Sequence, residues 1–545
     1  MCDQLRADYL SCAGHKSLQT PNIDKLAERG VRFTNAYVQS PICGPSRASI
    51  YTGRYASAHG ASANFVPLRL GERNIGDYLR PLGVRPVLVG KTHSMPDRAG
   101  MARLGIDPAS EIGVRHANAG FDPFERDDGI FPDRMMKMIG QPRYNDYLRE
   151  QGYEGGNPWH WAANSVETDT GVRSGFYNDI ADKPAVVAEE HSETPYMTRR
   201  AMDFMAEDDG DTPWLLHLSY IKPHWPYIAP APYNDMYGPE DVQAAIRSEA
   251  ELDDQNQLMR HFVERVAGRT FSRDEAIQKI VPAYMGLVKQ IDDQLGRLFA
   301  WMEDRGLMET TTIVFTSDHG DYLGDHWMGD KDYFHNPSVK IPLIIADPAA
   351  EMDATRGTTS DALVQGIDLL PTFIERYGGD VPEHLIDGRS LLPLLTGEAE
   401  DIHEYVVSEY DYHQQVFAPA TGRNSLDCRI YMVATRRWKY IHAPGFDPVL
   451  FDLDADPGEL TDLGRSLAHE GIRREMHARL SDWALQYRQR ETYDREMAAR
   501  FTAFEEEAGV LIGYWDESDL IDPANAMNPA QQPEIPSQSG KDRGR

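Results

Sequence analysis

The chain has 545 residues, 41% of them hydrophobic, and its 86 acidic against 55 basic residues give a net charge of −31. This length favours two domains, and the composition excludes a disordered chain. Because so acidic a surface repels nucleic acids and anionic membranes, we expect neither as a partner, and an anionic ligand would need a local basic pocket.

The cysteine content favours a reducing compartment. The four cysteines are Cys2, Cys12, Cys43 and Cys428, and their spacing matches neither a disulfide framework nor a metal site. No apolar run approaches the length of a membrane span, and no signal peptide precedes the first motif. We therefore expect a cytoplasmic protein.

Short apolar runs alternate with helical patterns over the first two thirds of the chain. This alternation predicts an α/β fold with a large, mostly parallel sheet flanked by helices. A first helix is expected to begin at Thr20-Pro21, with Thr20 as N-cap, and to stop near Gly30. Apolar positions spaced by three and four residues predict a long helix over 280–298. The candidate strands are 86–89, 214–218, 312–316 and 341–345.

The pattern changes after about residue 400. We predict a main α/β domain over 1–400, a smaller α+β subdomain over 401–505 and an extended tail over 506–545. The predicted elements of the subdomain are a hairpin of strands 429–434 and 438–442, a third strand over 449–453 and a helix near 472–488.

Residues 43–53, Cys-Gly-Pro-Ser-Arg-Ala-Ser-Ile-Tyr-Thr-Gly, carry the most specific motif of the chain. Pro45 suits the first turn of a helix, because the amide that it lacks would be unpaired there. Cys43 would then face the unpaired amides of a helix start, where an anion is favoured. Arg47 adds a fork-shaped charge that suits sulfate or phosphate oxygens. Taken alone, such a cysteine is more often a buried core residue.

This segment resembles the type I sulfatase signature, Cys-x-Pro-Ser-Arg-x-x-x-Leu-Thr-Gly, of the alkaline phosphatase superfamily. It departs at Tyr51, where the family usually has leucine or methionine. The matching residues are Cys43, Pro45, Ser46, Arg47, Thr52 and Gly53. The resemblance implies that a formylglycine-generating enzyme oxidises Cys43 to Cα-formylglycine, whose hydrated aldehyde is the nucleophile. It also implies an alkaline-phosphatase-like fold, with a smaller C-terminal antiparallel sheet followed by a helix.

Two polar clusters indicate a metal site. Asp3-Gln4 stands near the start of the chain, and Ser-Asp-His-Gly-Asp over 317–321 directly follows a predicted strand. Open α/β sheets place their ligand sites at such strand ends. Carboxylates with a neutral imidazole make a hard-to-borderline cation site. An Asp-His pair in a loop, taken alone, is more often hydrogen-bonded surface.

By resemblance, the metal ligands are Asp3, Gln4, Asp318 and His319, completed by an oxygen on residue 43. Many sulfatases have Asp-Asp and Asp-Asn at these two places and bind calcium. Gln4 and His319 resemble instead the bacterial phosphonate monoester hydrolases of the same superfamily, which use manganese. Because imidazole suits manganese better than calcium, we expect one Mn²⁺ ion, with Ca²⁺ as the alternative.

Basic residues follow the predicted strands 86–89 and 214–218, and one more basic residue stands further along the chain. They are Lys91, His93, Lys222, His224 and Lys331. A lone lysine is nearly always solvated, and a lone histidine is more often structural, but these five would converge on one edge of the sheet. Sulfatases have Lys-x-His and Lys-Pro-His at the corresponding places, and the phosphonate hydrolases resemble this chain at Asn64. The implied substrate-binding set is Asn64, Lys91, Lys222, His224 and Lys331.

The resemblance implies metal-dependent hydrolysis of sulfate monoesters through a covalent sulfate hemiacetal on residue 43. Arg47 would hold the nucleophile, and the three lysines with the metal would stabilise charge on the sulfate oxygens. His224, helped by Lys331, would protonate the leaving oxygen. His93 would then expel sulfate by removing a proton from the second hydroxyl. An aromatic lining suits an aryl sulfate, although each residue equally suits a core; the candidates are Phe65, Trp225 and Tyr227.

The nearest alternative is a phosphonate monoester or phosphodiester hydrolase with the same parts, at least as a promiscuous activity. Those enzymes have Tyr-x-Thr where this chain has Lys91-x-His93, and the difference favours a sulfate ester as main substrate. A second alternative is a non-enzymatic anion-binding protein in which Cys43 stays unmodified.

Enzymes of this family usually carry a short apolar strand ahead of the first metal ligands, whereas only Met1-Cys2 precedes Asp3 here. We therefore expect a truncated first strand. The stretch 522–545 is rich in Pro, Gln, Ser and Gly and indicates an extended segment. Because such extensions join subunits in phosphonate hydrolases, we expect a homo-oligomer, either a dimer or a tetramer.

Overall fold

The computed structural model describes residues 1–208, 210, 212–253, 255–486, 494–501, 508 and 515. The chain divides into two units, Met1–Gln486 and Tyr487–Arg545, and each is described by itself. The described part of the second unit contains the helix α18 (Arg495–Phe501). Apart from Ala508 and Trp515, the tail predicted over 506–545 lies outside the described residues, so that prediction and the oligomer inferred from it stay predictions.

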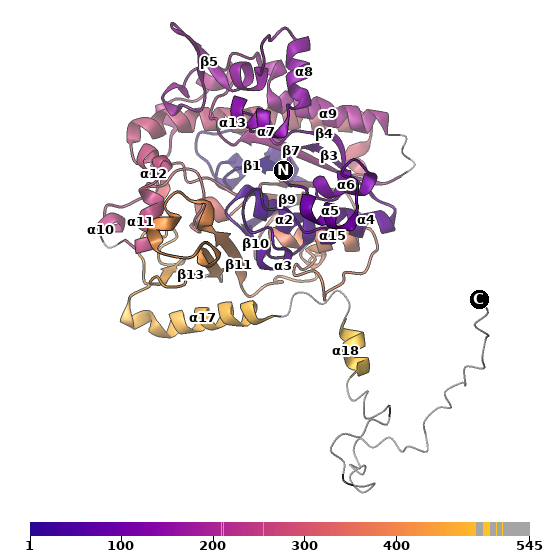
Figure 1. Ribbon diagram of the computed structural model, residues 1–545, viewed down its shortest axis with the longest axis vertical. Coiled ribbons are helices and arrows are strands. Elements are labelled where there is room, and N and C mark those ends of the chain that lie inside the picture. The colour runs from indigo at the N-terminus through magenta and orange to yellow at the C-terminus, as the bar shows by residue number, and fades with distance from the viewer. Residues whose placement is uncertain are drawn as a thin grey trace, which may run out of the picture. The chain divides into compact units, whose positions relative to one another are not determined.

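Two four-stranded sheets meet edge to edge in the first unit (Figure 1). Their orders are β1-β7-β3-β4 and β10-β2-β9-β8. A parallel bridge between Cys2 and Ser317 links β1 to the segment after β8, so the two form one continuous sheet. The strands are β1 (Cys2–Asp3), β2 (Val31–Tyr37), β3 (Arg85–Gly90), β4 (Asp122–Arg126), β7 (Trp214–Pro223), β8 (Ile313–Thr316), β9 (Leu343–Ala346) and β10 (Thr358–Gln365).

Strand direction in this sheet confirms the mostly parallel fold. The two pairs that involve β9 are antiparallel, and the remaining pairs between described strands are parallel. All four strands predicted from the sequence are present, with ends that differ by a few residues. The largest difference is in β7, which continues to Pro223 because Tyr220 and Pro223 pair with β1. Lys222 therefore lies within a strand rather than after it.

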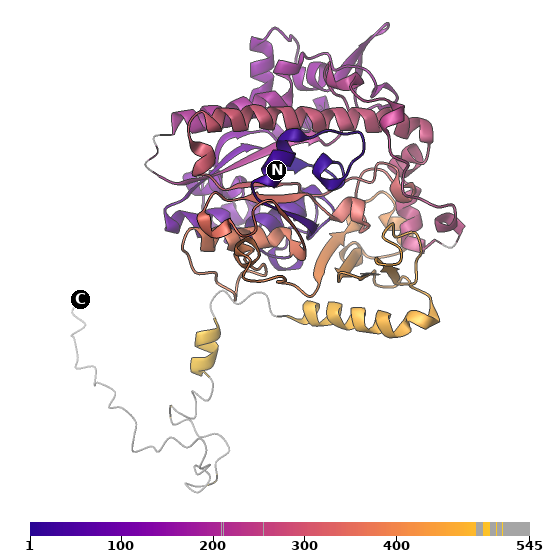
Figure 2. The same cartoon turned by 180° about the vertical axis from the view of Figure 1, so that it is seen from behind.

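Helices cover both faces of the sheet (Figure 1). One face carries α1 (Pro21–Glu28), α9 (Glu193–Glu207) and α13 (Asp274–Glu303), whose apolar residues share one core cluster. The other carries α2 (Cys43–Thr52), α4 (Ile75–Leu79) and α15 (Leu369–Arg376), which contribute to a second cluster. Figure 2 shows α13 as the long helix that runs across its face, with α1 beside it. This is the arrangement that strands alternating with helices predict.

The two helices predicted in this region are confirmed. The helix α1 begins at Pro21 and ends at Glu28, before Gly30. Thr20 precedes it without the predicted side-chain cap, because its hydroxyl instead bonds to Asp24. The helix α13 extends beyond the predicted 280–298 at both ends.

Shorter helices and one hairpin complete the main domain. They are α3 (Ala56–His59), α5 (Arg98–Leu104), α6 (Glu111–Ala117), α7 (Asp133–Ile139), α8 (Arg143–Glu150), α10 (Ala250–Asp253), α11 (Gln257–Val263), α12 (Val266–Phe271), α14 (Asn336–Val339) and α16 (Leu392–Thr396), with the hairpin β5 (Ser165–Thr168) and β6 (Gly171–Ser174). Among the described helices, none combines the length and apolarity that a membrane span requires.

A separate antiparallel sheet follows, in the order β11-β12-β13-β14. The strands are β11 (Val406–Asp411), β12 (Arg429–Ala434), β13 (Trp438–His442) and β14 (Val449–Asp452). The helix α17 (Glu470–Leu485) packs on this sheet through Met476, Leu480 and Trp483. The predicted smaller sheet with its helix is thus confirmed, whereas β11 was not predicted. Val31 and Met432 belong to the same core cluster, which therefore spans residue 400.

An apolar cavity of about 530 Å³ lies between β7 and β8. Its walls include 214–218 of β7, 313–316 of β8 and Met1. The α-amino group of Met1 donates to the carbonyl of Leu218 at 2.8 Å, and β1 pairs with Tyr220 and Pro223 of β7. The expectation of a truncated first strand stays a prediction.

Candidate active site

Cys43 is the first residue of α2, and Pro45 lies in the first turn, as the motif predicts. The helix ends at Thr52, and Gly53 follows it with a left-handed φ of 67°, which favours glycine. The main-chain N–H of Gly44 donates to Oδ1 of Asn64 at 2.8 Å, so Asn64 fixes the turn that carries Cys43.

The unusual motif residue, Tyr51, is accommodated by the sheet beneath α2. Its hydroxyl lies 2.9 Å from Nε2 of His217 in β7, and its ring meets Phe121 edge-on at 5.3 Å between centroids. Tyr51 is buried and lines the apolar cavity. The departure from the family pattern therefore concerns packing under the helix and leaves Cys43 at its end undisturbed.

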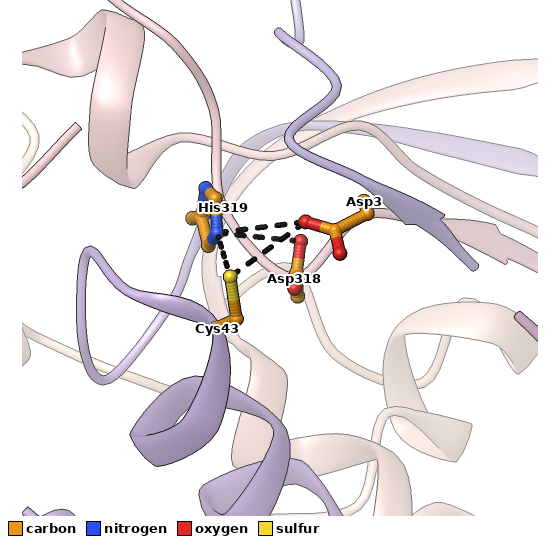
Figure 3. A group of neighbouring side chains, drawn as sticks. All are labelled: Asp3, Cys43, Asp318 and His319. Atoms are coloured by element: carbon orange, nitrogen blue, oxygen red, sulfur yellow. Dashed lines mark hydrogen bonds and ion pairs between the residues drawn. The ribbon is translucent and has the colours of Figure 1, made fainter. Parts of the chain in front are cut away.

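Four side chains from three segments face one another at the carboxyl edge of the sheet (Figure 3). Asp3 ends β1, Asp318 and His319 follow β8, and Cys43 begins α2. All four are buried, and their ligand atoms lie within 4.8 Å of one another. The Nε2 of His319 is 3.1 Å from Sγ of Cys43 and 3.7 Å from Oδ1 of Asp318. We call this group the acid–thiol cluster.

Arg47, one turn into α2, is a fixed positive charge beside both carboxylates. Its Nε donates to Oδ2 of Asp318 at 2.7 Å, and its Nη2 lies 3.5 Å from Oδ2 of Asp3. Its Nη1 donates to the carbonyl of Lys91 at 2.9 Å, and the Nζ of Lys91 pairs with Asp3. Burial opposes the charge, but Asp318 outweighs it and raises the pKa of Arg47.

Lys331 and His224 stand on another side of Cys43. The Nζ of Lys331 is 3.4 Å from Sγ of Cys43 and 3.0 Å from Nε2 of His224. The Nδ1–H of His224 donates to the carbonyl of Trp225 at 2.7 Å. This leaves Nε2 as the acceptor that faces Lys331. Burial and the nearby Lys331 lower the pKa of His224, which keeps its ring neutral.

These charges favour an anion at residue 43. Burial raises the pKa of the Cys43 thiol, but Lys331, Lys91 and His319 outweigh it and hold the pKa well below its ordinary value. Burial and the Cys43 thiolate oppose ionisation of Asp3, yet Lys91 and its neighbours outweigh them and lower the pKa of Asp3. The basic pocket that an acidic chain requires is therefore present here.

His319 presents Nε2 to the cluster. Its Nδ1–H donates to the carbonyl of Gly320 at 2.9 Å, the kind of backbone bond that fixes a metal-ligating histidine. Burial lowers its pKa, but Asp318 and Cys43 outweigh burial and raise it to about 9.

The donors fit a divalent cation. Two carboxylates and one imidazole converge within the span of a coordination sphere. The oxygen of the Gln4 amide accepts from Nζ of Lys331 at 2.8 Å, and the same Nζ lies 3.4 Å from Sγ of Cys43. A mixed oxygen and nitrogen donor set suits manganese, whereas calcium prefers oxygen alone. The buried, convergent geometry differs from the exposed acidic groups that occur without a metal.

Two predicted residues lie outside this group. The Nζ of Lys222 donates to Oδ1 of Asn164 at 2.9 Å and to the carbonyl of Pro226 at 3.0 Å. The main-chain N–H of His93 donates to Asp128 at 2.9 Å. Within the described residues, no hydrogen bond joins Lys222 or His93 to the acid–thiol cluster. Lys222 is engaged elsewhere because β7 continues past the point where the sequence predicted its end.

Of the aromatic residues predicted to line the site, Tyr227 is buried and donates to Asp321 at 2.6 Å. Phe65 is 54% exposed and packs edge-on against His93, at 5.5 Å between ring centroids. Trp225 is partly exposed, and the centroid of its ring lies 6.0 Å from that of Phe176. Phe65 and Trp225 therefore keep exposed ring surface, whereas Tyr227 belongs to the core.

Sequence reasoning missed the residues that hold Lys331. The Nη2 of Arg265 donates to the carbonyl of Lys331 at 2.9 Å, and its Nη1 pairs with Asp332. The hydroxyl of Tyr410, from the C-terminal sheet, donates to Asp332 at 2.9 Å. No local pattern marks these residues, because they meet Lys331 only through the fold.

Comparison with known proteins agrees with this geometry. The sulfatase family model matches residues 1–379, and the model described as N-sulphoglucosamine sulphohydrolase, C-terminal, matches residues 324–486. The chain is 33% identical over 512 residues to the multifunctional alkaline phosphatase superfamily protein PehA of Trinickia caryophylli, which covers 90% of this chain and 95% of that protein. It is 26% identical to an arylsulfatase of Clostridium perfringens, over 85% of this chain and 89% of the relative.

Solved structures of similar fold include two phosphonate monoester hydrolases. The enzyme of Agrobacterium radiobacter matches with a TM-score of 0.76 and 28% identity, covering 89% of this chain and 94% of that one. The enzyme of Silicibacter pomeroyi also matches with a TM-score of 0.76 and 28% identity, covering 91% and 96%. The predicted alkaline-phosphatase-like fold is therefore confirmed.

Proposed function

The chain belongs to the sulfatase family, and from this premise we propose that it hydrolyses sulfate monoesters, with residue 43 as the nucleophile. The observation that carries the proposal is the charge around Cys43. A buried thiol at a helix start, 3.4 Å from an ammonium group and beside a second lysine and an imidazole, is built to hold an anion.

We propose that Cys43 is converted to Cα-formylglycine by a formylglycine-generating enzyme. The hydrated aldehyde would supply a hydroxyl nucleophile on the Cβ of residue 43. The lysines that lower the pKa of the thiol would equally stabilise an alkoxide at the same place, because their field acts on charge and not on sulfur. After attack on sulfur, the second hydroxyl would expel sulfate, which removes the need for water to attack a sulfate ester.

We propose that Asp3, Gln4, Asp318 and His319 hold a divalent cation, Mn²⁺ in preference to Ca²⁺. When bound, the ion would act as a Lewis acid on the reacting oxygens. Arg47 would hold the carboxylates of Asp3 and Asp318 in place. Lys91 and Lys331 would bind the sulfate oxygens.

The proton for the leaving oxygen would come from His224 and Lys331. Their side chains share a hydrogen bond of 3.0 Å, so a proton can pass between them without movement of the backbone. The Nδ1 of His93 is buried without a hydrogen-bond partner, which leaves it available as the base that removes the proton of the second hydroxyl. The exposed ring of Phe65 and the partly exposed Trp225 suit an aryl leaving group.

Hydrolysis of phosphonate monoesters or phosphodiesters is the second candidate. It is favoured by the match to two phosphonate monoester hydrolases and by the histidine and glutamine in the metal-binding set. Both substrates carry one negative charge on a tetrahedral centre, so the charge of the site does not separate them. The Lys91-x-His93 pattern, which resembles the sulfatase pattern at this place, supports the sulfate ester.

The decisive experiment compares kcat/KM of the purified enzyme on an aryl sulfate and on the aryl phosphonate with the same leaving group. We expect the sulfate to be the better substrate, and a preference for the phosphonate would reverse the assignment. The intact mass of the peptide that contains Cys43 tests the modification, because exchange of the thiol for an aldehyde lowers that mass. Full activity with an unmodified cysteine would overturn the assignment of formylglycine at residue 43 as the nucleophile.

A further inference from the structure

The side-chain amide of Gln4 is held in one orientation. Its Nε2 donates to Oδ2 of Asp321 at 2.6 Å and to Oδ1 of Asp330 at 3.1 Å. Its Oε1 accepts from Nζ of Lys331 at 2.8 Å. The side chain is buried, so water cannot replace these partners. Acceptors surround the nitrogen and a donor faces the oxygen, so the oxygen is the end that faces Lys331, whose Nζ lies 3.4 Å from Sγ of Cys43.

We propose that Asp321 is a positioning residue that keeps the oxygen of Gln4 turned toward the metal-binding group. Only the oxygen of an amide can bind a cation, and its N–H₂ end would repel one. In the flipped amide, the oxygen of Gln4 would stand against the carboxylate of Asp321 at the present 2.6 Å contact, and two acceptors would face each other without a proton between them.

Asp321 is better suited to this role than its neighbours. The carboxylate of Asp321 accepts from Nε2 of Gln4 at 2.6 Å, whereas the hydroxyl of Tyr227 is a longer contact at 3.3 Å and gives its one proton to Asp321. The side chain of Asp330 is 25% exposed and its Oδ1 is shared with Nε1 of Trp225. Asp321 is fully buried, and its other oxygen is fixed by the main-chain N–H of Leu323 at 3.1 Å.

This inference rests on the proposed metal site, so its test measures cation affinity directly. Calorimetric titration of the metal-stripped full-length protein with Mn²⁺ gives the dissociation constant without any assay of activity. We expect Asp321→Asn to weaken Mn²⁺ binding by about tenfold or more, the usual cost of losing a partner that orients a metal ligand. Its amide can donate to Gln4 and so permits the flipped state.

The same substitution in a Gln4→Glu background separates orientation from charge. A glutamate has two oxygens and needs no orienting partner, so Asp321→Asn should weaken binding several-fold less there than in the Gln4 protein. In the glutamate background the asparagine also removes a contact between two carboxylates, which acts in the same direction as the expected smaller loss. Tyr227→Phe is the matched control. It removes the hydrogen bond from Tyr227 to Oδ2 of Asp321 but leaves this oxygen as the acceptor for Gln4, so the affinity for Mn²⁺ should change by less than about threefold.

Equal losses in the two backgrounds, or an unchanged affinity of Asp321→Asn, would overturn the positioning role while leaving the metal site intact. Absence of Mn²⁺ and Ca²⁺ binding by the unsubstituted protein would instead overturn the metal site itself and this inference with it. If Asp321→Asn does not fold, Asp321→Glu replaces it, and there a shifted carboxylate should also weaken binding. Unchanged affinity of Asp321→Glu would count against the role.

Discussion

The two halves of β7 differ in how completely they are packed. From Ser219 to Pro223 the strand is buried, and the hydroxyl of Ser219 accepts from Arg47 at 2.8 Å. From Trp214 to Leu218 the same strand is only partly buried and lines the cavity of about 530 Å³. On one side, β3 pairs with residues 214–219 of the strand. On the other side, β1 pairs with Tyr220 and Pro223, within the buried half.

This contrast shows that loss of a partner costs more stability for a buried charge than for an apolar side chain. At the site end, each buried charge has a partner, and removal of one leaves another uncompensated in a medium of low polarity. At the cavity end, the mostly apolar lining loses dispersion contacts, and its charged residues Asp347 and Arg376 pair with each other, so the cavity persists at modest cost. Substitutions should therefore have large effects at the site end and small ones at the cavity end.

The largest effect is expected for Cys43→Ala. This variant removes the atom on which the nucleophile is built, so kcat/KM on an aryl sulfate should fall by about 10⁴-fold or more, as for other enzymes that lose a nucleophile. Cys12→Ala is the matched control, because Cys12 lies outside the acid–thiol cluster and should retain full activity. Comparable losses in both variants would show that the effect comes from general damage.

Arg47→Gln should destabilise the protein by about 3–5 kcal/mol, because Asp3 and Asp318 would lose the cation that balances them in a fully buried site. Denaturant unfolding measures this change as a lower midpoint. Arg29→Gln serves as the control, since its ion pair with Glu309 is largely exposed and should contribute less than about 1 kcal/mol. If the two arginines contributed equally, burial would not govern the contrast between the regions.

Arg265→Gln should lower kcat/KM by about 10- to 100-fold, because Lys331 would lose the anchor on its carbonyl and shift relative to Cys43. If Lys331 acts in the transition state, the loss should appear in kcat more than in KM. Arg269→Gln, an exposed residue of α12, should leave both constants unchanged. An effect confined to stability, with kcat intact, would mean that Arg265 only holds the loop.

Sequence patterns predicted the parts of the site that are local in the chain. Cys43 and Arg47 belong to one motif, Asp318 and His319 directly follow a strand, and these residues meet where the sheet model places strand ends. Lys222 shows where this reasoning stops. It also follows an apolar run, but pairing with β1 extends β7 through it, and its Nζ bonds to Asn164 instead. Pairing between distant segments has no signature in the local sequence.

The same limit applies to the support of Lys331. Arg265 directly precedes α12 and Tyr410 lies in β11, neither of which was predicted from the sequence, and both are separated from Lys331 by many residues. Asp321 was visible as the last residue of a polar loop, yet its contact with Gln4 requires β1 and β8 to lie side by side. Residue types were therefore predictable, whereas their partners depended on tertiary structure.

The smallest expected effect, and the sharpest test of the contrast, is a change of one methylene group at each end. Val314 of β8 lines the cavity, so Val314→Ile should fill part of it and stabilise the protein by about 0.5–1 kcal/mol. Val89 of β3 is fully buried in the packed core, so Val89→Ile should destabilise it by about 1 kcal/mol or more through overpacking. Denaturant unfolding of both variants measures whether each substitution raises or lowers the free energy of unfolding. Opposite signs are expected because the cavity has room for the added group and the core does not, and destabilisation by both would mean that the cavity wall cannot accept even a small side chain.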